Sequence, residues 1–368
     1  MASRASGNRI SAGDRTLNRE KLLALSLLRH TVLDEIRTTL RERLGYLEAT
    51  PSTLVNIAGS CENPHTSFKV DYYGRPAYLS QSAQLQLEAL VLRLQRGFFT
   101  ANNSFREEHF DDPETPGRRL SEFTLIEAEK PVGEYAGEIL RPHNAVTELI
   151  HEQQIVIARV LEKVLEDNKK EIHKLCREYP RRGVSQTEYL GQVFLLALGN
   201  IPQWTYDETL QRLNTSDFSK QRGKQYIFGD DLSTLEEREL IRQNDGMPLF
   251  VTHHPASLKF FNMKRTPDGQ RVYSVDLLMP RLGETIGGAV REEDGDVIKE
   301  QLETSKVGAF MREQGIPFPG PFAEYFRTLK EEPPTLRAGY GIGFERLIGF
   351  LIGSTDILET VAYRTLQP

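Results

Sequence analysis

The sequence predicts an α+β fold in which an antiparallel sheet is flanked by helices. Two observations support this prediction. Strand-like segments gather in two groups, at about 68–128 and 249–278, and helical segments precede, separate and follow these groups. Strands and helices therefore do not alternate as they do in a parallel β-α-β fold. The chain has 368 residues, of which 39% are hydrophobic, so it can bury a sizeable core without a metal or a disulfide.

The N-terminal region divides into a tail and a helix. Residues 1–16 are rich in Ser, Gly and Arg and are expected to form a disordered tail; a transit peptide is the alternative. From Leu17 to Leu44, apolar residues recur mostly at three- or four-residue steps, which is typical of an amphipathic helix. Gly45 follows where a glycine commonly ends a helix.

The first group of strands begins with a hairpin. Phe68–Tyr73 alternates apolar and polar residues, and residues 74–76 provide the turn. The segments expected next are a strand at 77–79, a helix at 83–96 capped by Ser80 or Ser82, a strand at 98–105, a loop at 111–117 and a strand at 120–128.

A helical insertion is expected at about 144–245, between the two groups of strands. Its first helix, 144–177, carries apolar residues such as Val146, Ile150 and Ile157 on one face. The segments expected after it are helices at 186–197 and 235–243, strands at 249–252, 259–263 and 272–278, a turn at Thr266–Gly269 and a final helix at 344–351.

Charge, cysteine content and hydropathy make some classes of protein less favoured. The net charge of −6 gives no basic footprint of the kind that nucleic-acid binders usually carry. Cys61 and Cys176 form neither a CxxC pair nor a metal-ligand spacing, so a reducing cytoplasm is expected. No run approaches the ~18 apolar residues of a membrane span.

The first segment that could bind a ligand has Arg106 and Glu108 on one strand and Phe123 and Glu127 on the returning strand. An arginine can pair with a phosphate through its planar fork, and an aromatic ring can stack on a base. The alternative is a surface hairpin with cross-strand ion pairs.

A second segment contains Asp276 and Glu284, which could share a Mg²⁺ ion that bridges phosphates. Gly287 and Gly288 allow a close approach of the backbone, and Arg291 could bind a carboxylate. An acidic strand end followed by a turn is the alternative.

In the third segment, Gly339, Gly341 and Gly343 precede Arg346. A dinucleotide-binding loop is excluded because no β-α-β unit surrounds these glycines.

Together these segments resemble class II aminoacyl-tRNA synthetases, and within them the aspartyl/asparaginyl branch, most of all its asparaginyl members. The resemblance extends from about residue 33 to the C-terminus. It rests on Tyr78–Glu88, Arg119–Glu129, Val275–Gly288 and Gly339–Leu347, and residues 44–51 resemble motif 1 at the family's dimer interface. The first and third segments resemble the family's motifs 2 and 3, so that Arg346 lies in motif 3, and the second resembles the metal-binding strand between them. The expected organisation is therefore one catalytic domain at 17–368, with the helical insertion between motifs 2 and 3.

The resemblance implies roles for particular residues. Arg106 and Arg346 would act on the ATP phosphates, Glu108 and Phe123 would hold the adenine, and Asp276 and Glu284 would bind Mg²⁺. The residues expected to contact the amino acid are Glu62, Gln84, Glu88, Glu127 and Arg291.

Several departures bear on the substrates. Leu87–Glu88 is typical of the asparaginyl branch, where aspartyl members usually have a lysine at the first position, so a neutral amide is favoured. The family's anticodon-binding OB domain of ~100 residues is expected to be absent. The loop at 109–117 is acidic, and an acidic loop repels nucleic-acid phosphates. Arg119 replaces a usual histidine, and Asn63–Pro64 replaces two usual glycines.

The expected function is ATP-dependent adenylation of an asparagine- or aspartate-like amino acid, followed by transfer to ammonia or a small amine without tRNA. The alternative is a truncated synthetase that acylates tRNA or a tRNA-like RNA. A non-catalytic paralogue is disfavoured because Arg106, Asp276, Glu284 and Arg346 are all present. A cytoplasmic homodimer, formed through the motif 1 region, is also expected.

Overall fold

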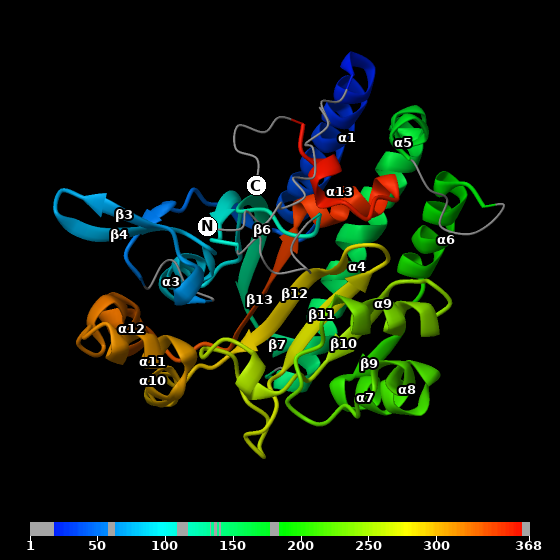
Figure 1. Ribbon diagram of the computed structural model, residues 1–368. Coiled ribbons are helices and arrows are strands. Elements are labelled where there is room, and N and C mark those ends of the chain that lie inside the picture. Colours follow the sequence, from blue (N-terminus) through cyan, green and yellow to red (C-terminus); the bar gives the residue numbers. More distant parts are fainter. Residues whose placement is uncertain are drawn as a thin grey trace, which may run out of the picture.

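The computed structural model describes residues 18–57, 63–108, 117–132, 141–176 and 184–362, together with the backbone of two short strands, β7 (Glu134–Tyr135) and β8 (Glu138–Ile139). Its centre is an eight-stranded sheet with the order β1-β5-β6-β13-β12-β11-β10-β9 (Figure 1). The bounds are β1 Leu47–Glu48, β5 Phe98–Phe105, β6 Glu122–Pro131, β13 Arg337–Gly343, β12 Gly283–Arg291, β11 Ser274–Met279, β10 Leu249–Thr252 and β9 Gln203–Thr205.

The predicted α+β class is confirmed, and the sheet is antiparallel through its centre. The pairs from β5 to β10 are all antiparallel. At the two edges, β1 pairs with β5 and β9 pairs with β10 in the parallel sense. The sheet is therefore mixed, and the prediction of an antiparallel sheet holds for the six central strands.

One face of the sheet is covered by α1 (Arg19–Thr38), α4 (Pro142–Asp167) and α13 (Phe344–Ile352), which lie together in Figure 1. Their apolar side chains form one core with the strands, in which Leu28, Ile157, Leu277 and Leu347 are buried. The predicted N-terminal helix is confirmed. It continues as a π-helical turn at Thr39–Arg43 and ends at Gly45, whose φ is 75°.

The long helix predicted at 144–177 is interrupted. Asn168 has a φ of −118°, which is not helical, so the segment divides into two helices, α4 and α5 (Lys169–Leu175). The rest of the segment to residue 245 contains α6 (Gln186–Leu198), α7 (Tyr206–Thr215), α8 (Asp217–Arg222), α9 (Thr234–Gln243) and the edge strand β9. None of the helices in the described ranges is long and apolar enough to cross a membrane.

A second, three-stranded sheet has the order β2-β4-β3, with bounds Leu54–Val55, Arg75–Leu79 and Lys69–Tyr72. The predicted hairpin is confirmed, but its turn is formed by Tyr73 and Gly74, which have φ values of 53° and 77°. The next helix, α3 (Gln84–Leu94), begins where Ser82 Oγ accepts the backbone N–H of Gln84 at 3.1 Å.

The strand predicted at 259–263 is wrong. Residues Ala256–Leu258 form a 3-10 turn, and Met263 makes only an isolated bridge with Arg291. The rings of Phe260 and Phe261 lie 4.4 Å apart, whereas consecutive side chains of a strand point to opposite faces. Both rings pack with α10 (Gly295–Thr304), α11 (Lys306–Glu313) and α12 (Ala323–Glu331), which lie beside α3 in Figure 1.

Candidate active site

Strand β6 forms one wall of a cavity of about 960 Å³ on the face of the sheet that α4 leaves open. Alternate residues of a strand point to the same side. Phe123, Glu127 and Glu129 therefore line the cavity, as Leu125 does, while the residues between them, such as Ile126 and Ala128, join the apolar core behind the sheet.

The cavity brings together the predicted site residues from distant parts of the chain. It is lined by Gln84, Arg106, Glu108, Phe123, Glu127, Asp276, Glu284, Arg291 and Arg346. Glu62 lies outside the described residues. Glu88 does not line the cavity, and its position is given below.

One end of the cavity is rich in arginine. The guanidinium carbon of Arg106 lies 5.9 Å from the centroid of the Phe123 ring. Arg346, from the first turn of α13, donates a hydrogen bond to the backbone oxygen of Glu284. Glu108 is held by Arg119 through an Nη1–Oε2 ion pair of 3.1 Å. An aromatic ring among cationic side chains suits a nucleotide, because the ring can stack on a base while the cations meet phosphates.

The carboxylates of Asp276 and Glu284 meet above Gly287. A Cβ atom at Gly287 would lie 2.5 Å from Glu284 Oε1 and 3.4 Å from Asp276 Oδ1. Burial, with the neighbouring charge of Asp276, raises the pKa of Glu284. Two neighbouring carboxylates that repel each other fit a hard cation.

No group of three or more His, Cys, Asp or Glu side chains in the described ranges is arranged to hold a metal ion. A cation bound between Asp276 and Glu284 would therefore need further ligands. Phosphate oxygens and water are the usual ones for Mg²⁺.

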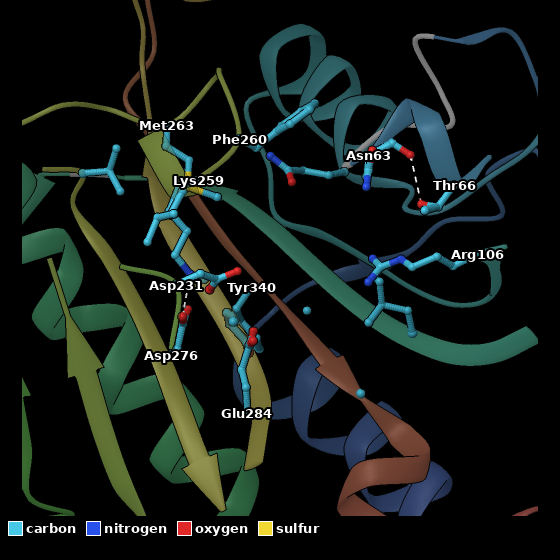
Figure 2. A pocket seen from close by; sticks show the side chains of 18 of the residues that line it. Asn63, Thr66, Arg106, Asp231, Lys259, Phe260, Met263, Asp276, Glu284 and Tyr340 are labelled. Carbon is cyan, nitrogen blue, oxygen red and sulfur yellow. Dashed lines mark hydrogen bonds and ion pairs between the residues drawn. The ribbon is translucent and has the colours of Figure 1, made fainter. Parts of the chain in front are cut away.

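Asp276 has two further partners, Lys259 and His254. Lys259 Nζ lies 2.5 Å from Asp276 Oδ2 (Figure 2). His254 Nε2 lies 3.2 Å from the same oxygen. Burial, followed by the charge of Lys259, lowers the pKa of His254 well below its usual value. His254 is thus neutral, and its Nδ1 lies 3.0 Å from Ser274 Oγ. The Lys259 contact arises because 259–263 turns instead of forming a strand.

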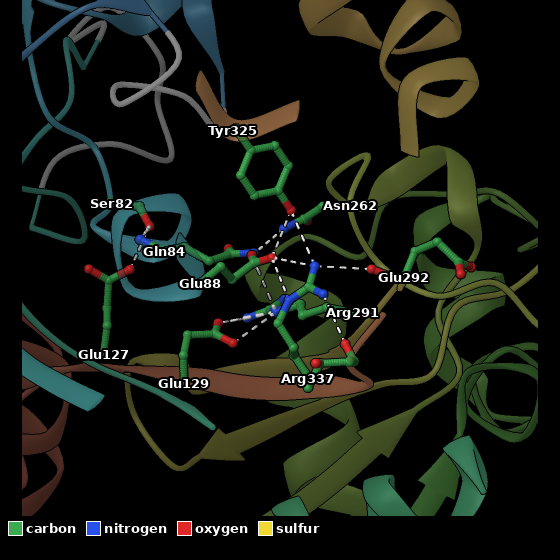
Figure 3. A network of polar contacts seen from close by, with 11 residues as sticks. Ser82, Gln84, Glu88, Glu127, Glu129, Asn262, Arg291, Glu292, Tyr325 and Arg337 are labelled. Atoms are coloured by element: carbon green, nitrogen blue, oxygen red, sulfur yellow. Dashed lines mark hydrogen bonds and ion pairs between the residues drawn. The ribbon is translucent and has the colours of Figure 1, made fainter. Parts of the chain in front are cut away.

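The other end of the cavity holds Arg291 and Glu129. Arg291 Nε donates to Glu129 Oε1 at 3.1 Å, and a second donation comes from Nη2 (Figure 3). Among the described residues, Arg291 Nη1 has no hydrogen-bond partner. Burial raises the pKa of Glu129 to about 7, and Arg291 only partly offsets it. Glu129 was missed from the sequence, although its two-residue spacing from Glu127 places both on one face of β6.

Glu88 lies behind this end of the cavity rather than in its wall. Its carboxylate is fully buried and pairs with Arg337 Nη2 at 3.0 Å. It also accepts hydrogen bonds from Tyr325 at 2.8 Å and from Gln84 Nε2 at 3.0 Å. The predicted direct contact with an amino acid is thereby corrected, because Glu88 reaches the cavity through two of its lining residues. These are Gln84 and Arg291, whose Nε lies 3.9 Å from Glu88 Oε1.

Glu127 is held at the start of α3. Its Oε2 accepts the backbone N–H of Ala83 at 2.7 Å, and its Oε1 accepts the Ser82 hydroxyl at 2.5 Å. These bonds fix the strand against the helix that carries Gln84, so that both side chains face the cavity from adjoining elements.

Glu237 of α9 is a further residue that sequence reasoning missed. Its Oε2 accepts the backbone N–H of Glu284 at 3.3 Å. Burial, followed by the charge of Glu284, raises the pKa of Glu237 to about 7. Gly283 has a φ of 78°, which favours glycine, and a Cβ there would also meet this carboxylate. The segment 235–243 was predicted only as a helix, with no signal that one of its faces lines the cavity.

A model of the family "tRNA synthetases class II (D, K and N)" matches residues 10–367. The chain belongs to this family. The cytoplasmic asparagine–tRNA ligase of Saccharomyces cerevisiae is 31% identical over 348 residues, covering 94% of this chain and 55% of that protein. A probable cytoplasmic asparagine–tRNA ligase of Schizosaccharomyces pombe is 32% identical over 319 residues, covering 86% and 49%. The chain thus spans about half the length of these class II relatives.

Solved class II structures show the same architecture. Asparaginyl-tRNA synthetase from Pyrococcus horikoshii, complexed with asparaginyl-adenylate, superimposes with a TM-score of 0.74 at 27% identity, covering 93% of this chain and 68% of that one. The Entamoeba histolytica enzyme, also with asparaginyl-adenylate, gives a TM-score of 0.72 at 25% identity, with 95% and 68% covered. The predicted similarity to the asparaginyl members of class II is confirmed. The acidic part of the motif 2 loop, 109–116, lies outside the described residues.

Proposed function

We propose that the chain uses ATP to convert an asparagine-like amino acid into an aminoacyl adenylate. The observation that carries this proposal is the single cavity in which Arg106, Phe123 and Arg346 stand at one end and Arg291 and Glu129 at the other. The two relatives solved with asparaginyl-adenylate support the same reaction. The cavity of about 960 Å³ has a size typical of ligand sites.

The chemical step is the attack of the α-carboxylate of the amino acid on the α-phosphorus of ATP. A carboxylate oxygen forms the new bond to phosphorus, and the bond to the pyrophosphate oxygen breaks. No proton needs to move, so the site must align two anions and neutralise their charge. Arg106 and Arg346 supply fixed positive charge where the phosphates would lie.

Asp276 and Glu284 would hold Mg²⁺. When bound, Mg²⁺ would neutralise phosphate charge and fix the phosphate geometry. Lys259 Nζ donates a hydrogen bond to Asp276 Oδ2 and so orients that carboxylate.

The pair formed by Arg291 and Glu129, at the other end of the cavity, would select an amino acid with a carboxamide side chain. Arg291 can donate to an amide oxygen, and ionised Glu129 can accept from an amide NH₂. A carboxylate side chain would instead be repelled by Glu129. The free Nη1 donor of Arg291, counted among the described residues, supports its role in binding the side chain.

For the acceptor, the curated relatives favour tRNA, because those named above are asparagine–tRNA ligases. Transfer to ammonia or a small amine is the second candidate, and the acidic residues at 111–114 favour it because they would repel a tRNA phosphate. We further propose a homodimer through the motif 1 region, where Leu47 of β1 is exposed. A cytoplasmic location is proposed from the same relatives.

The test is ATP–pyrophosphate exchange with each amino acid, with and without tRNA. We expect exchange with asparagine. No exchange with any amino acid would overturn the proposal. Acylation that tRNA stimulates and ribonuclease removes would establish the first acceptor, and formation of an amide from ammonia or an amine would establish the second.

A further inference from the structure

Helix α1 lies on the far side of the sheet from the cavity, but Arg29 connects it to the cavity wall. Arg29 Nη2 donates to Glu345 Oε1 at 3.0 Å, and Nη1 donates to the backbone oxygen of Thr360 at 2.8 Å. The guanidinium carbon also lies 4.7 Å from the centroid of the Phe344 ring. One side chain of α1 thus holds the start of α13 and the 3-10 turn Ile357–Thr360.

Glu345 also forms a hydrogen bond with β6. Its second oxygen, Oε2, accepts the backbone N–H of Thr124 at 2.9 Å. The ladder between β13 and β6 ends with the pair Gly343–Leu125. The Glu345 carboxylate therefore extends the link between the two segments by one residue beyond the last strand pair.

The two ends of this link adjoin two residues of the proposed ATP site. Thr124 directly follows Phe123, and Glu345 directly precedes Arg346. We infer that Arg29 is a positioning residue for ATP, acting through Glu345 on the backbone of Phe123 and Arg346. The inference rests on the proposed function.

The charge of Arg29 is needed because Glu345 is only 4% exposed. Removal of the arginine leaves a buried carboxylate without its counter-charge, which favours rearrangement of that side chain. A displacement of about 1 Å in a site that aligns reacting groups can lower a rate by roughly a hundredfold.

The test compares Arg29→Gln with Arg37→Gln, both on α1. Arg37 forms an ion pair of 2.9 Å with Glu48, in which the two side chains are 36% and 33% exposed. ATP affinity is measured by isothermal titration calorimetry, and the KM values for ATP and amino acid by pyrophosphate exchange. We expect Arg29→Gln to weaken ATP binding by about five- to tenfold, which is roughly the net contribution of one hydrogen bond, and Arg37→Gln to leave it unchanged.

The KM for the amino acid should stay constant in Arg29→Gln, because Arg291 and Glu129 bond each other and not this link. Arg29→Lys, which keeps the charge, should restore part of the ATP affinity. If Arg29→Gln does not fold, Arg29→Lys decides, with a smaller loss of ATP affinity expected.

Wild-type ATP affinity in folded Arg29→Gln, or an equal rise in both KM values, would overturn the inference alone. If Arg29→Gln does not fold, unchanged ATP affinity in Arg29→Lys would do the same. Absence of ATP binding by the wild-type chain would overturn the proposed function together with it.

Discussion

Arg291 and Glu129 form a buried ion pair at one end of the cavity, with Nε and Oε1 3.1 Å apart. The arginine is 3% exposed and the glutamate 2%. The pKa of Glu129 is raised to about 7 because burial disfavours its charge more than Arg291 favours it. Glu129 therefore changes from a hydrogen-bond donor to an acceptor-only group near neutral pH.

This change should set the preference between asparagine and aspartate. Below pH 7 the protonated Glu129 can donate to a carboxylate side chain, and above pH 7 the ionised form repels it. We expect the ratio of asparagine to aspartate in pyrophosphate exchange to rise by about tenfold from pH 6 to pH 8, following the protonated fraction. Glu129→Gln, which does not titrate, should show a flat ratio. A ratio that still rises in Glu129→Gln would assign the titration to another group.

Arg346→Ala should lower the rate of the proposed adenylation by roughly 10²- to 10³-fold. Its guanidinium supplies positive charge at the arginine-rich end of the cavity, and removal of one such stabilising group lowers kcat by roughly 10²- to 10³-fold. Arg242→Gln is the control, because this arginine of α9 is 71% exposed and, within the described ranges, pairs with Glu239 of the same helix. Pyrophosphate exchange at the wild-type rate in Arg346→Ala would show that the motif 3 assignment is wrong.

Gly287→Ala should weaken metal binding while the protein still folds. The added Cβ would stand 2.5 Å from Glu284 Oε1, so the two carboxylates could not close on a cation. We expect the Mg²⁺ concentration for half-maximal exchange to rise by about tenfold or more, since well-placed ligands are needed for Mg²⁺. Gly191→Ala, where the Cβ meets open space, should behave as wild type. Direct Mn²⁺ titration by electron paramagnetic resonance gives a second readout, and unchanged Mn²⁺ affinity in Gly287→Ala would contradict the metal assignment.

Glu88→Gln should destabilise the fold and weaken amino-acid binding together. Its carboxylate neutralises buried Arg337, and breaking a buried pair costs about 3–5 kcal/mol. Glu324→Gln on α12 is the matched control, because its partners Arg93 and Arg327 are exposed; we expect less than about 1 kcal/mol there. Urea unfolding measures both.

A KM for the amino acid that stays at the wild-type value in folded Glu88→Gln would show that Glu88 does not position Gln84. The KM for ATP serves as the internal reference, because Glu88 makes no bond to the arginine-rich end among the contacts described above.

The sequence predicts the parts of this fold that depend on local pattern. Strand β5 and strand β10 begin and end at the predicted residues, because apolar runs bounded by turn residues define them. The strand predicted at 259–263 does not form because of tertiary packing. Phe260 and Phe261 both pack against α10–α12, and this packing overrides their strand propensity.

The site divides in the same way. Residues in motifs, such as Arg106 and Arg346, could be placed in one cavity from family resemblance alone. Lys259, Glu237 and Arg29 could not, because each enters the network from a segment with no motif. Their positions depend on how a turn, α9 and α1 pack against the sheet, and single-sequence periodicity contains no such information.

Strand β6 should not tolerate insertions or deletions, because alternate residues of it line the cavity. These residues are Phe123, Leu125, Glu127 and Glu129. Inserting or deleting one residue within β6 would exchange the two faces of the strand beyond that point. Acidic side chains would then enter the apolar core, and Ile126 or Ala128 would enter the cavity. Length changes before Glu122 lie outside β6 and avoid this effect, so natural variants should carry length changes before Glu122 and none between Phe123 and Glu129.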